Sequence, residues 1–143
     1  MLNEQLLKKG NILTCPVAVI ISGGKVLIGH RHYTPDKWKT ISVWTCPGGR
    51  CSEGETIERA LRREVKEEVG INDLKITEYL GKVPGAKKGD KVLLFLCRTS
   101  QEPRNLESRK FSEWKWEKPE DIEEETFINP SALKLIRRAT ETS

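Results

Sequence analysis

Residues 49–71 read GRCSEGETIERALRREVKEEVGI, and this stretch carries the strongest evidence in the sequence about the fold. Within it, Ile57–Val69 contains strong helix formers and neither glycine nor proline, which predicts a helix. The hydroxyl of Thr56 can satisfy a free amide at the start of that helix. Gly70 can adopt the left-handed conformation that ends a helix. The stretch therefore predicts one helix with defined ends.

Three glutamates crowd one edge of the predicted helix. At about 100° per residue, Glu67 and Glu68 lie roughly 60° and 40° to either side of Glu64. Carboxylates at this spacing repel one another unless a positive charge compensates, and hard divalent cations prefer oxygen ligands of this kind. Basic residues on the same helix can also pair with the acids. The helix alone therefore leaves a metal site and a solvated charged face as alternatives.

The residues in front of the helix favour the metal site. Pro47-Gly48-Gly49 brings bare backbone close to the helix, where its carbonyls could reach a metal. On the adjoining side of the helix, an apolar stripe would anchor it on a sheet while the acidic edge faces a cleft. That stripe comprises Leu61, Val65 and Val69.

Apolar patterns elsewhere predict strands interleaved with helices. We expect strands around 17–21, 25–32, 74–83, 91–100 and 112–117, with Gly23-Gly24 as a hairpin turn and 85–90 as the loop of a second hairpin. We expect a loop over 33–43, a short N-terminal helix containing Leu2, Leu6 and Leu7, a helical turn at Pro119 and a C-terminal helix from Pro130. The order indicates one mixed α/β domain over residues 1–143, with its sheet between helical layers.

Composition excludes several classes of protein. The chain has 143 residues and a net charge of +4, which is too mild to indicate a nucleic-acid partner but suits phosphorylated small molecules. No apolar run approaches the length of a membrane span, so we expect a soluble, cytoplasmic protein without a membrane partner. The four cysteines form no Cys-x-x-Cys pair, which favours reduced structural thiols.

As a pattern, residues 49–71 resemble the Nudix box, Gly-x5-Glu-x7-Arg-Glu-U-x-Glu-Glu-x-Gly-U, where U is a bulky aliphatic residue. Every defined position is filled, by Gly49, Glu55, Arg63, Glu64, Val65, Glu67, Glu68, Gly70 and Ile71. The resemblance implies a Nudix-type α/β/α sandwich with a mixed β-sheet. It also implies a Mg²⁺-dependent pyrophosphohydrolase, with Mn²⁺ as a substitute, in which water attacks phosphorus.

The resemblance assigns roles to the acidic residues and to the glycine turn. Glu64 and Glu68 would bind the metal, Glu67 would be a ligand or the base, and the carbonyl of Gly48 would be a further ligand. The general base would be Glu64 or Glu67 of the box or, as in other family members, a residue of a later loop. In this chain the main candidate for a base from a later loop is Glu107, and Glu113 is the second candidate.

Other roles follow from the same resemblance or from the residues themselves. Glu55 and Arg63 would steady the loop and the helix through a charge-assisted contact. Arg31, at the end of the second strand, could hold a phosphate through a bidentate contact, although an exposed strand-end arginine is the alternative. Lys87 and Lys88 could meet phosphate from the second hairpin, with a solvated turn as the alternative.

Aromatic residues supply candidates for contact with a base. Trp38, Trp44 and Phe111 lie in or beside predicted cleft loops and could stack on a nucleobase. Core packing or loop anchoring is the alternative for each of them. Trp114 and Trp116 share one strand face, which favours a place in the core.

Three functions are consistent with the sequence. The first is hydrolysis of a nucleoside triphosphate, including one with an oxidised or modified purine base, to a monophosphate and pyrophosphate. The second is cleavage of a linked nucleoside diphosphate such as ADP-ribose or a dinucleoside polyphosphate. The third is a non-catalytic nucleotide-binding domain, which the intact box carboxylates disfavour. The short chain favours a small substrate over capped RNA, and a homodimer is consistent with the resemblance.

Overall fold

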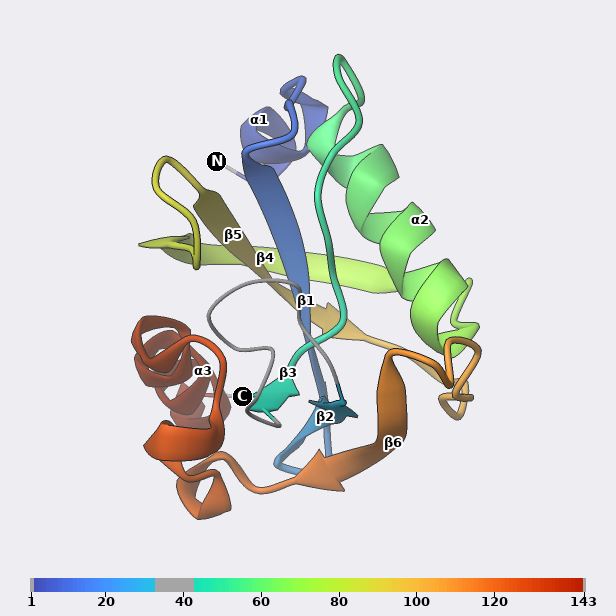
Figure 1. Cartoon of the computed structure of the whole chain (residues 1–143), viewed down its shortest axis with the longest axis vertical. Helices are drawn as coiled ribbons and strands as arrows, with labels where there is room; N and C mark the ends of the chain where they lie inside the picture. Colours follow the sequence, from blue (N-terminus) through green and yellow to red (C-terminus); the bar gives the residue numbers. More distant parts are fainter. Residues whose placement is uncertain (1, 33–42, 143) are drawn as a thin grey trace.

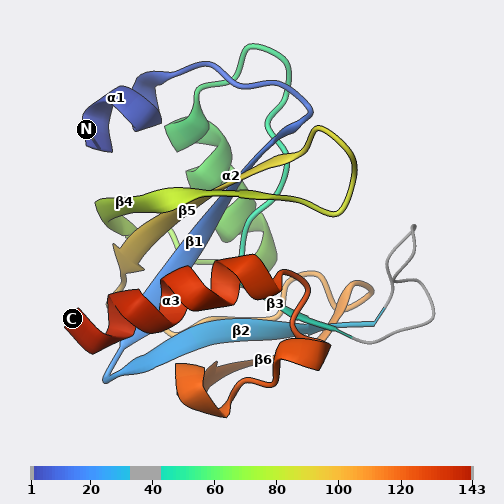
Figure 2. The ribbon, with the colours of Figure 1, turned by 90° about the vertical axis from the view of Figure 1, so that its left-hand side faces the viewer.

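The computed structural model describes residues 2–32 and 43–142. Its elements surround one mixed sheet, which lies between α1 and α2 on one face and α3 on the other (Figures 1 and 2). The described helices are α1 (Leu2–Leu7), α2 (Ile57–Val69) and α3 (Pro130–Thr142), with short 3₁₀ turns η1 (Pro119–Asp121) and η2 (Glu124–Thr126). The described strands are β1 (Thr14–Ser22), β2 (Lys25–Arg31), β3 (Val43–Thr45), β4 (Lys75–Pro84), β5 (Lys91–Arg98) and β6 (Phe111–Glu117).

Strand pairing makes the sheet mixed, as predicted. The main order is β3-β2-β1-β5-β4, and β6 pairs with β2. The two predicted hairpins, β1–β2 and β4–β5, are both antiparallel. By contrast, β1 and β5 run parallel, with Thr14 opposite Lys91 and Ile20 opposite Cys97. This parallel pair holds together segments that are far apart in the sequence.

The central strand β1 contributes to two separate cores. Ala18 and Ile20 belong to the buried cluster that packs on α2, whereas Val19 and Ile21 belong to the cluster that packs on α3. Successive side chains of a strand point to opposite faces, so one apolar strand can serve both layers. The arrangement confirms the predicted α/β/α sandwich.

Helix α2 has the ends that its sequence predicted. The Thr56 hydroxyl accepts a hydrogen bond from the backbone N–H of Arg59 at 3.2 Å. At the other end, Gly70 has a φ of 71° and donates its N–H to the carbonyl of Lys66 at 3.0 Å. The predicted apolar stripe of Leu61, Val65 and Val69 is fully buried against the sheet. Because this stripe packs on the sheet, the edge of the helix that carries the glutamates is left facing away from the core.

One described strand was not predicted. Residues 43–45 were expected to belong to a loop and to its end, but they form β3 by pairing with the last residues of β2. A three-residue strand has no periodicity to detect, so only its partner reveals it. The candidate Trp38 lies outside the described residues. Within the described ranges, no helix is long and apolar enough to cross a membrane.

Candidate functional site

The glycine turn before α2 lies directly on β1. The N–H of Ala18 donates to the carbonyl of Pro47 at 2.8 Å, and the N–H of Gly49 donates to the carbonyl of Pro16 at 3.2 Å. A Cβ atom on Gly48 would lie 2.5 Å from the carbonyl oxygen of Pro16, a backbone atom that cannot move aside alone. Only glycine allows this approach. The turn is thereby fixed between β1 and the acidic edge of α2.

Glu68 is the buried carboxylate of the site. Its residue is 5% exposed, and its Oε1 accepts a hydrogen bond from the N–H of Gly48 at 3.0 Å. Burial raises the pKa of Glu68 to about 8, the Gly48 N–H opposes that rise, and the charges of Glu64 and Glu107 add to it. The position therefore favours compensation of the carboxylate by a positive charge.

Glu64 lies beneath the next glycine of the turn. A Cβ atom on Gly49 would lie 2.5 Å from the carboxyl carbon of Glu64, so the missing side chain leaves space for this carboxylate. Burial raises the pKa of Glu64, while the hydrogen bond from Arg63 lowers it. Gly48 and Gly49 thus each have one box carboxylate against their backbone.

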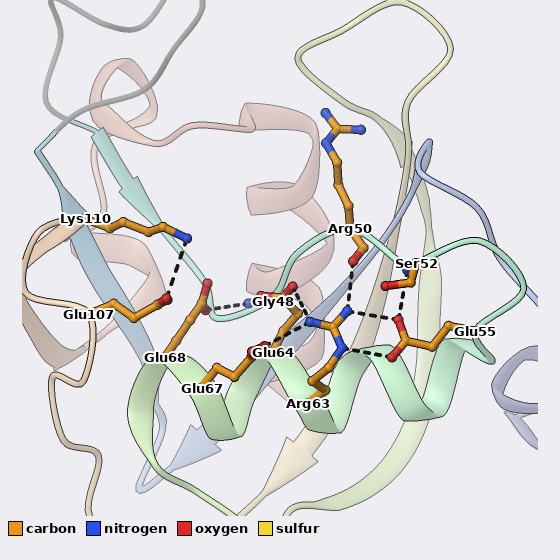
Figure 3. A network of polar contacts seen from close by, with 10 residues as sticks. All are labelled: Gly48, Arg50, Ser52, Glu55, Arg63, Glu64, Glu67, Glu68, Glu107 and Lys110. Atoms are coloured by element: carbon orange, nitrogen blue, oxygen red, sulfur yellow. Dashed lines mark hydrogen bonds and ion pairs between the residues drawn. The ribbon is translucent and has the colours of Figure 1, made fainter.

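Arg63 connects the acidic residues (Figure 3). Its Nε and Nη2 atoms each donate to a carboxylate oxygen of Glu55 at 2.9 Å, which is the charge-assisted contact that the sequence predicted. Its Nη1 atom donates to Glu64 at 3.0 Å and to Glu67 at 2.9 Å. Its Nη2 atom also donates to the carbonyl of Arg50 at 3.2 Å. One guanidinium therefore joins the loop before α2 to two box carboxylates.

The Glu55–Arg63 contact has a predicted pH signature. The hydrogen bonds from Arg63 lower the pKa of Glu55 from 4.5 to about 2. A depressed acid pKa stabilises the fold fully above the unfolded value, and this stabilisation is lost as the pH falls towards 2. At pH 7, Glu55→Gln should lower the free energy of unfolding by about 1.5–3 kcal/mol, the range for hydrogen bonds to charged groups.

Urea denaturation of the wild type and of Glu55→Gln at pH 7 and at pH 3 measures this effect. The difference in unfolding free energy should be large at pH 7 and should narrow at pH 3, where wild-type Glu55 is losing its stabilisation. The exposed loop residue Glu53 provides the control variant Glu53→Gln, for which little difference is expected at either pH. A gap for Glu55→Gln that is the same at both pH values would contradict the assignment.

The predicted metal ligands share one edge of the helix but do not form a closed set. Among the described residues, no group of three or more His, Cys, Asp or Glu side chains is placed to hold a metal ion. Glu64 and Glu67 turn towards Arg63, and the Glu67 side chain is 52% exposed. Glu68 turns instead to Gly48. Side-chain rotations of Glu64 and Glu67 would be needed to bring the three carboxylates to one ion.

The donor chemistry of this edge nevertheless fits a hard divalent cation. The available donors are carboxylate and backbone oxygens, the type that Mg²⁺ and Mn²⁺ prefer. Glu68 is buried beside the charges of Glu64 and Glu107, and the charge of Lys110 compensates it only in part. A divalent cation would supply the missing positive charge.

Glu107 reaches the same site from the segment between β5 and β6. The N–H groups of Arg104 and Leu106 donate to the carbonyls of Val69 and Glu68 at 2.9 and 3.1 Å, so the end of α2 anchors this segment. Figure 3 shows Glu107 and Lys110 facing Glu68, with 3.6 Å between Lys110 Nζ and Glu107 Oε2. Glu107, the candidate for a general base from a later loop, thus lies beside the glutamates of the box. Glu113 is instead exposed on β6.

A cavity of about 250 Å³ adjoins the glycine turn. Its walls come from the turn itself, the ends of β1 and β2, the β4–β5 hairpin and the start of α3. Arg31 lines this cavity, and its Nε atom is buried without a hydrogen-bond partner among the described residues. The lining also contains Val17, Leu94, Phe127, Ala132 and Ile136, which make much of the wall apolar. The cavity can therefore take an organic group beside the acidic edge.

The aromatic candidates are placed differently from the prediction. Phe111 is 2% exposed and its ring centroid lies 4.5 Å from that of Trp114, so it has no free face for a base and its predicted stacking role is wrong. The half-buried Trp44 already contacts the ring of His30, and it is absent from the cavity walls formed by the described residues. Trp114 and Trp116 pack against the α2 core, as predicted.

Sequence reasoning missed several cavity residues. Arg50 and Asp90 form an ion pair at 2.8 Å at the cavity wall, and Asn129, which also lines the cavity, donates to the carbonyl of Pro84. Asp90 lies in the predicted hairpin loop, where an aspartate is an ordinary turn residue, so nothing in the sequence indicated a partner for its side chain. A pairing across 40 positions has no local signal.

A family model of the NUDIX domain matches residues 14–139, a range that contains the box helix, the glycine turn and all the described cavity walls. The chain belongs to the Nudix family. The resemblance drawn from residues 49–71 is therefore confirmed. Proteins of the Nudix family generally use divalent metal ions, in agreement with the oxygen donors of the site.

Individual relatives within the Nudix family are distant. The NAD-capped RNA hydrolase NudC of Mannheimia succiniciproducens is 30% identical over 117 residues, which cover 80% of this chain but 43% of that protein. The chain thus spans less than half the length of that relative. The RNA pyrophosphohydrolase of Novosphingobium aromaticivorans is 26% identical over 146 residues, which cover 87% of each protein. The crystal structure of a MutT Nudix hydrolase from Burkholderia pseudomallei has a TM-score of 0.62 and 25% identity, covering 85% of this chain and 95% of that one.

Proposed function

We propose that this Nudix protein is a divalent-metal-dependent pyrophosphohydrolase that converts a nucleoside triphosphate into a monophosphate and pyrophosphate. The observation that carries the proposal is the contact of two box carboxylates, Glu68 and Glu64, with the Gly48–Gly49 backbone, which also lines a cavity of about 250 Å³. An acidic edge suits the metal that a polyphosphate chain brings or requires. The adjoining cavity suits the uncharged part of a nucleotide.

The metal would be Mg²⁺, with Mn²⁺ as a substitute, held by Glu64, Glu67, Glu68 and the carbonyl of Gly48. When bound, it would neutralise phosphate charge and lower the pKa of water. The chain's own contribution is orientation. Gly48 holds Glu68 through its N–H, whereas Glu64 and Glu67, which accept hydrogen bonds from Arg63, would rotate towards the ion.

Hydrolysis needs a proton acceptor and a bond that breaks. The oxygen of water bonds to phosphorus, the bridging P–O bond breaks, and pyrophosphate leaves with the electron pair. A carboxylate accepts the proton of the attacking water. Glu64, Glu67 and Glu107 remain the candidates for this role, and Glu107 lies beside Glu68 in Figure 3.

Arg31 is the proposed contact for the substrate beside the metal site. It lines the cavity, and its buried Nε–H, which has no acceptor among the residues that the structure describes, is costly unless a ligand supplies one. A phosphate oxygen of a ligand in the cavity would accept that N–H in a charge-assisted hydrogen bond. The proposal thus assigns recognition of charge to Arg31 and recognition of the base to the apolar part of the cavity wall.

The test is release of pyrophosphate and phosphate from a panel of nucleotides with Mg²⁺, with Mn²⁺ and with chelator. The panel contains standard and oxidised nucleoside triphosphates, ADP-ribose and diadenosine polyphosphates. We expect pyrophosphate from triphosphates only when metal is present, with the largest kcat/KM identifying the base. Activity confined to ADP-ribose or dinucleotides would contradict the triphosphate assignment and favour linked diphosphates. Binding of nucleotides by folded protein without turnover would instead favour a non-catalytic domain.

A second candidate substrate is the 5′-triphosphate end of RNA. The observation that favours it is the relative named RNA pyrophosphohydrolase, which aligns over 87% of both proteins. The bond would be the same, since pyrophosphate removal from RNA also cuts a phosphoanhydride at a 5′-nucleotide. Competition decides between them: a short 5′-triphosphate RNA should inhibit triphosphate hydrolysis well below the KM of the free nucleotide only if RNA is the better substrate.

A further inference from the structure

The turn of the β4–β5 hairpin forms one wall of the cavity. Gly85, Ala86, Lys87 and Asp90 all line it, opposite the N-terminal end of α3. Figure 2 shows this hairpin extending away from the sheet, above the start of α3. The turn's position relative to the glycine turn therefore sets the width of the cavity.

One ion pair fixes this hairpin to the glycine turn. The Asp90 side chain is 2% exposed, and its two oxygens accept from Nη1 and Nη2 of Arg50 at 2.8 and 2.9 Å. The pKa of Asp90 is lowered mainly by these hydrogen bonds. Arg50 follows Gly49 directly, donates to the carbonyl of Ile12 and accepts from Arg63 through its own carbonyl. The hairpin is thus tied to the residues that organise the box.

The same carboxylate fixes the backbone at one of two neighbouring lysines. Asp90 Oδ2 accepts a hydrogen bond from the backbone N–H of Lys87 at 3.0 Å. Lys87 lines the cavity, whereas Lys88 does not appear among the residues that line it, although both are exposed. The fold therefore separates two residues that are chemically identical in the sequence. A cation at a cavity edge beside the glycine turn suits an anionic group of the ligand.

We propose that Lys87 binds the phosphate chain of the substrate and that the Arg50–Asp90 pair is the positioning device that holds Lys87 against the cavity. The inference rests on the proposed function, because it takes a nucleoside polyphosphate as the ligand. It assigns substrate affinity, and not the chemical step, to the hairpin. Lys87 contacts substrate, and Arg50 and Asp90 act through it.

The first test compares Lys87→Ala with the matched control Lys88→Ala. Affinity for an α,β-methylene nucleoside triphosphate is measured by calorimetry, together with kcat and KM for the hydrolysable triphosphate. Lys87→Ala should weaken binding and raise KM by about tenfold, as expected for one lost charge-assisted contact, with kcat nearly unchanged. Lys88→Ala should leave both constants at the wild-type values, and Lys87→Arg should restore most of the affinity.

The second test asks whether the ion pair acts through Lys87. Asp90→Asn keeps the shape of the side chain but removes its charge, and it should raise KM nearly as much as Lys87→Ala. The KM of the double variant should be little higher than that of either single variant, because removing Lys87 has little further effect once the residue is no longer held in position. A purely structural ion pair would lower the melting temperature yet leave the full Lys87→Ala effect in place. If Asp90→Asn fails to fold, Arg50→Lys provides the same comparison.

Two results would overturn the inference alone, and two others concern the proposed function. Equal affinity of Lys87→Ala and Lys88→Ala for the analogue would remove Lys87 as a contact. Additive effects of Asp90→Asn and Lys87→Ala would remove the positioning role. Absence of analogue binding to the wild type would reject the nucleoside triphosphate itself, and with it both proposals. Wild-type binding without turnover would reject hydrolysis alone and leave the Lys87 comparison decisive.

Discussion

Glu68→Gln is expected to lower kcat by about 10³-fold, because it removes a negative charge from the edge where the metal is proposed to bind. The substitution changes little else. Glutamine Oε1 can still accept the hydrogen bond that Gly48 donates, so the glycine turn should stay in place. Steady-state hydrolysis of the best triphosphate with saturating Mg²⁺ measures the loss. Turnover within threefold of wild type would reject Glu68 as a metal ligand.

The same variant should respond to metal differently from the wild type. In chelator, Glu68→Gln should melt no lower than wild type, because a buried carboxylate beside Glu64 and Glu107 is costly and the neutral amide is less so. Added Mg²⁺ should raise the melting temperature of the wild type clearly and that of the variant much less. The matched control is Glu58→Gln, which removes an exposed ion pair with Arg62 on the same helix. Equal stabilisation of all three proteins by Mg²⁺ would place the ion elsewhere.

Gly48→Ala should disrupt both the fold and the site. The new Cβ would meet the carbonyl oxygen of Pro16 at 2.5 Å and the Cα atom of Val17 at 2.8 Å, so the turn must separate from β1. Overpacking of this kind costs about 1–3 kcal/mol, and we expect a loss of unfolding free energy in that range. Glu68 would lose its backbone partner as the turn moves, so turnover should fall as well.

Gly54→Ala is the control for the cost of placing alanine at a positive φ without a steric clash. Gly54 has a φ of 76° and nothing near its ideal Cβ position, so alanine there incurs only the cost of the left-handed conformation, about 1–2 kcal/mol. Urea denaturation with both the midpoint and the slope reported separates the two variants. If Gly48→Ala were as stable and as active as Gly54→Ala, the close approach of the turn to β1 would be needed for neither stability nor turnover.

Much of the fold was predictable because its signals are local. Helix α2 begins after Thr56 and ends before Gly70, as the sequence indicated, since capping residues and propensity act within a few positions. The two hairpins were equally accessible from their turn residues and alternating strands. Strand β3 was not, because residues 43–45 become a strand only through pairing with β2.

The candidate site was predictable in its composition but not in its arrangement. The spacing of Glu64, Glu67 and Glu68 gave a shared helix edge, yet spacing alone does not say that Arg63 draws two of them towards itself. Phe111 was predicted to lie at a cleft, but it is buried and its ring packs against that of Trp114. The sequence does not show how deeply the strand that carries both residues is buried. Side-chain orientation depends on neighbours that the fold supplies.

The parallel pairing of β1 with β5 also sets when the site can form during folding. Thr14 lies opposite Lys91, 77 positions further along the chain, so this contact closes a long loop before it gains stability. The glycine turn rests on β1 and the cavity hairpin extends from β5, so neither can take its place until those strands meet. Helix α2, by contrast, has its capping contacts within its own segment. Catalytic competence is therefore a late property of the folding chain, acquired after its most local structure.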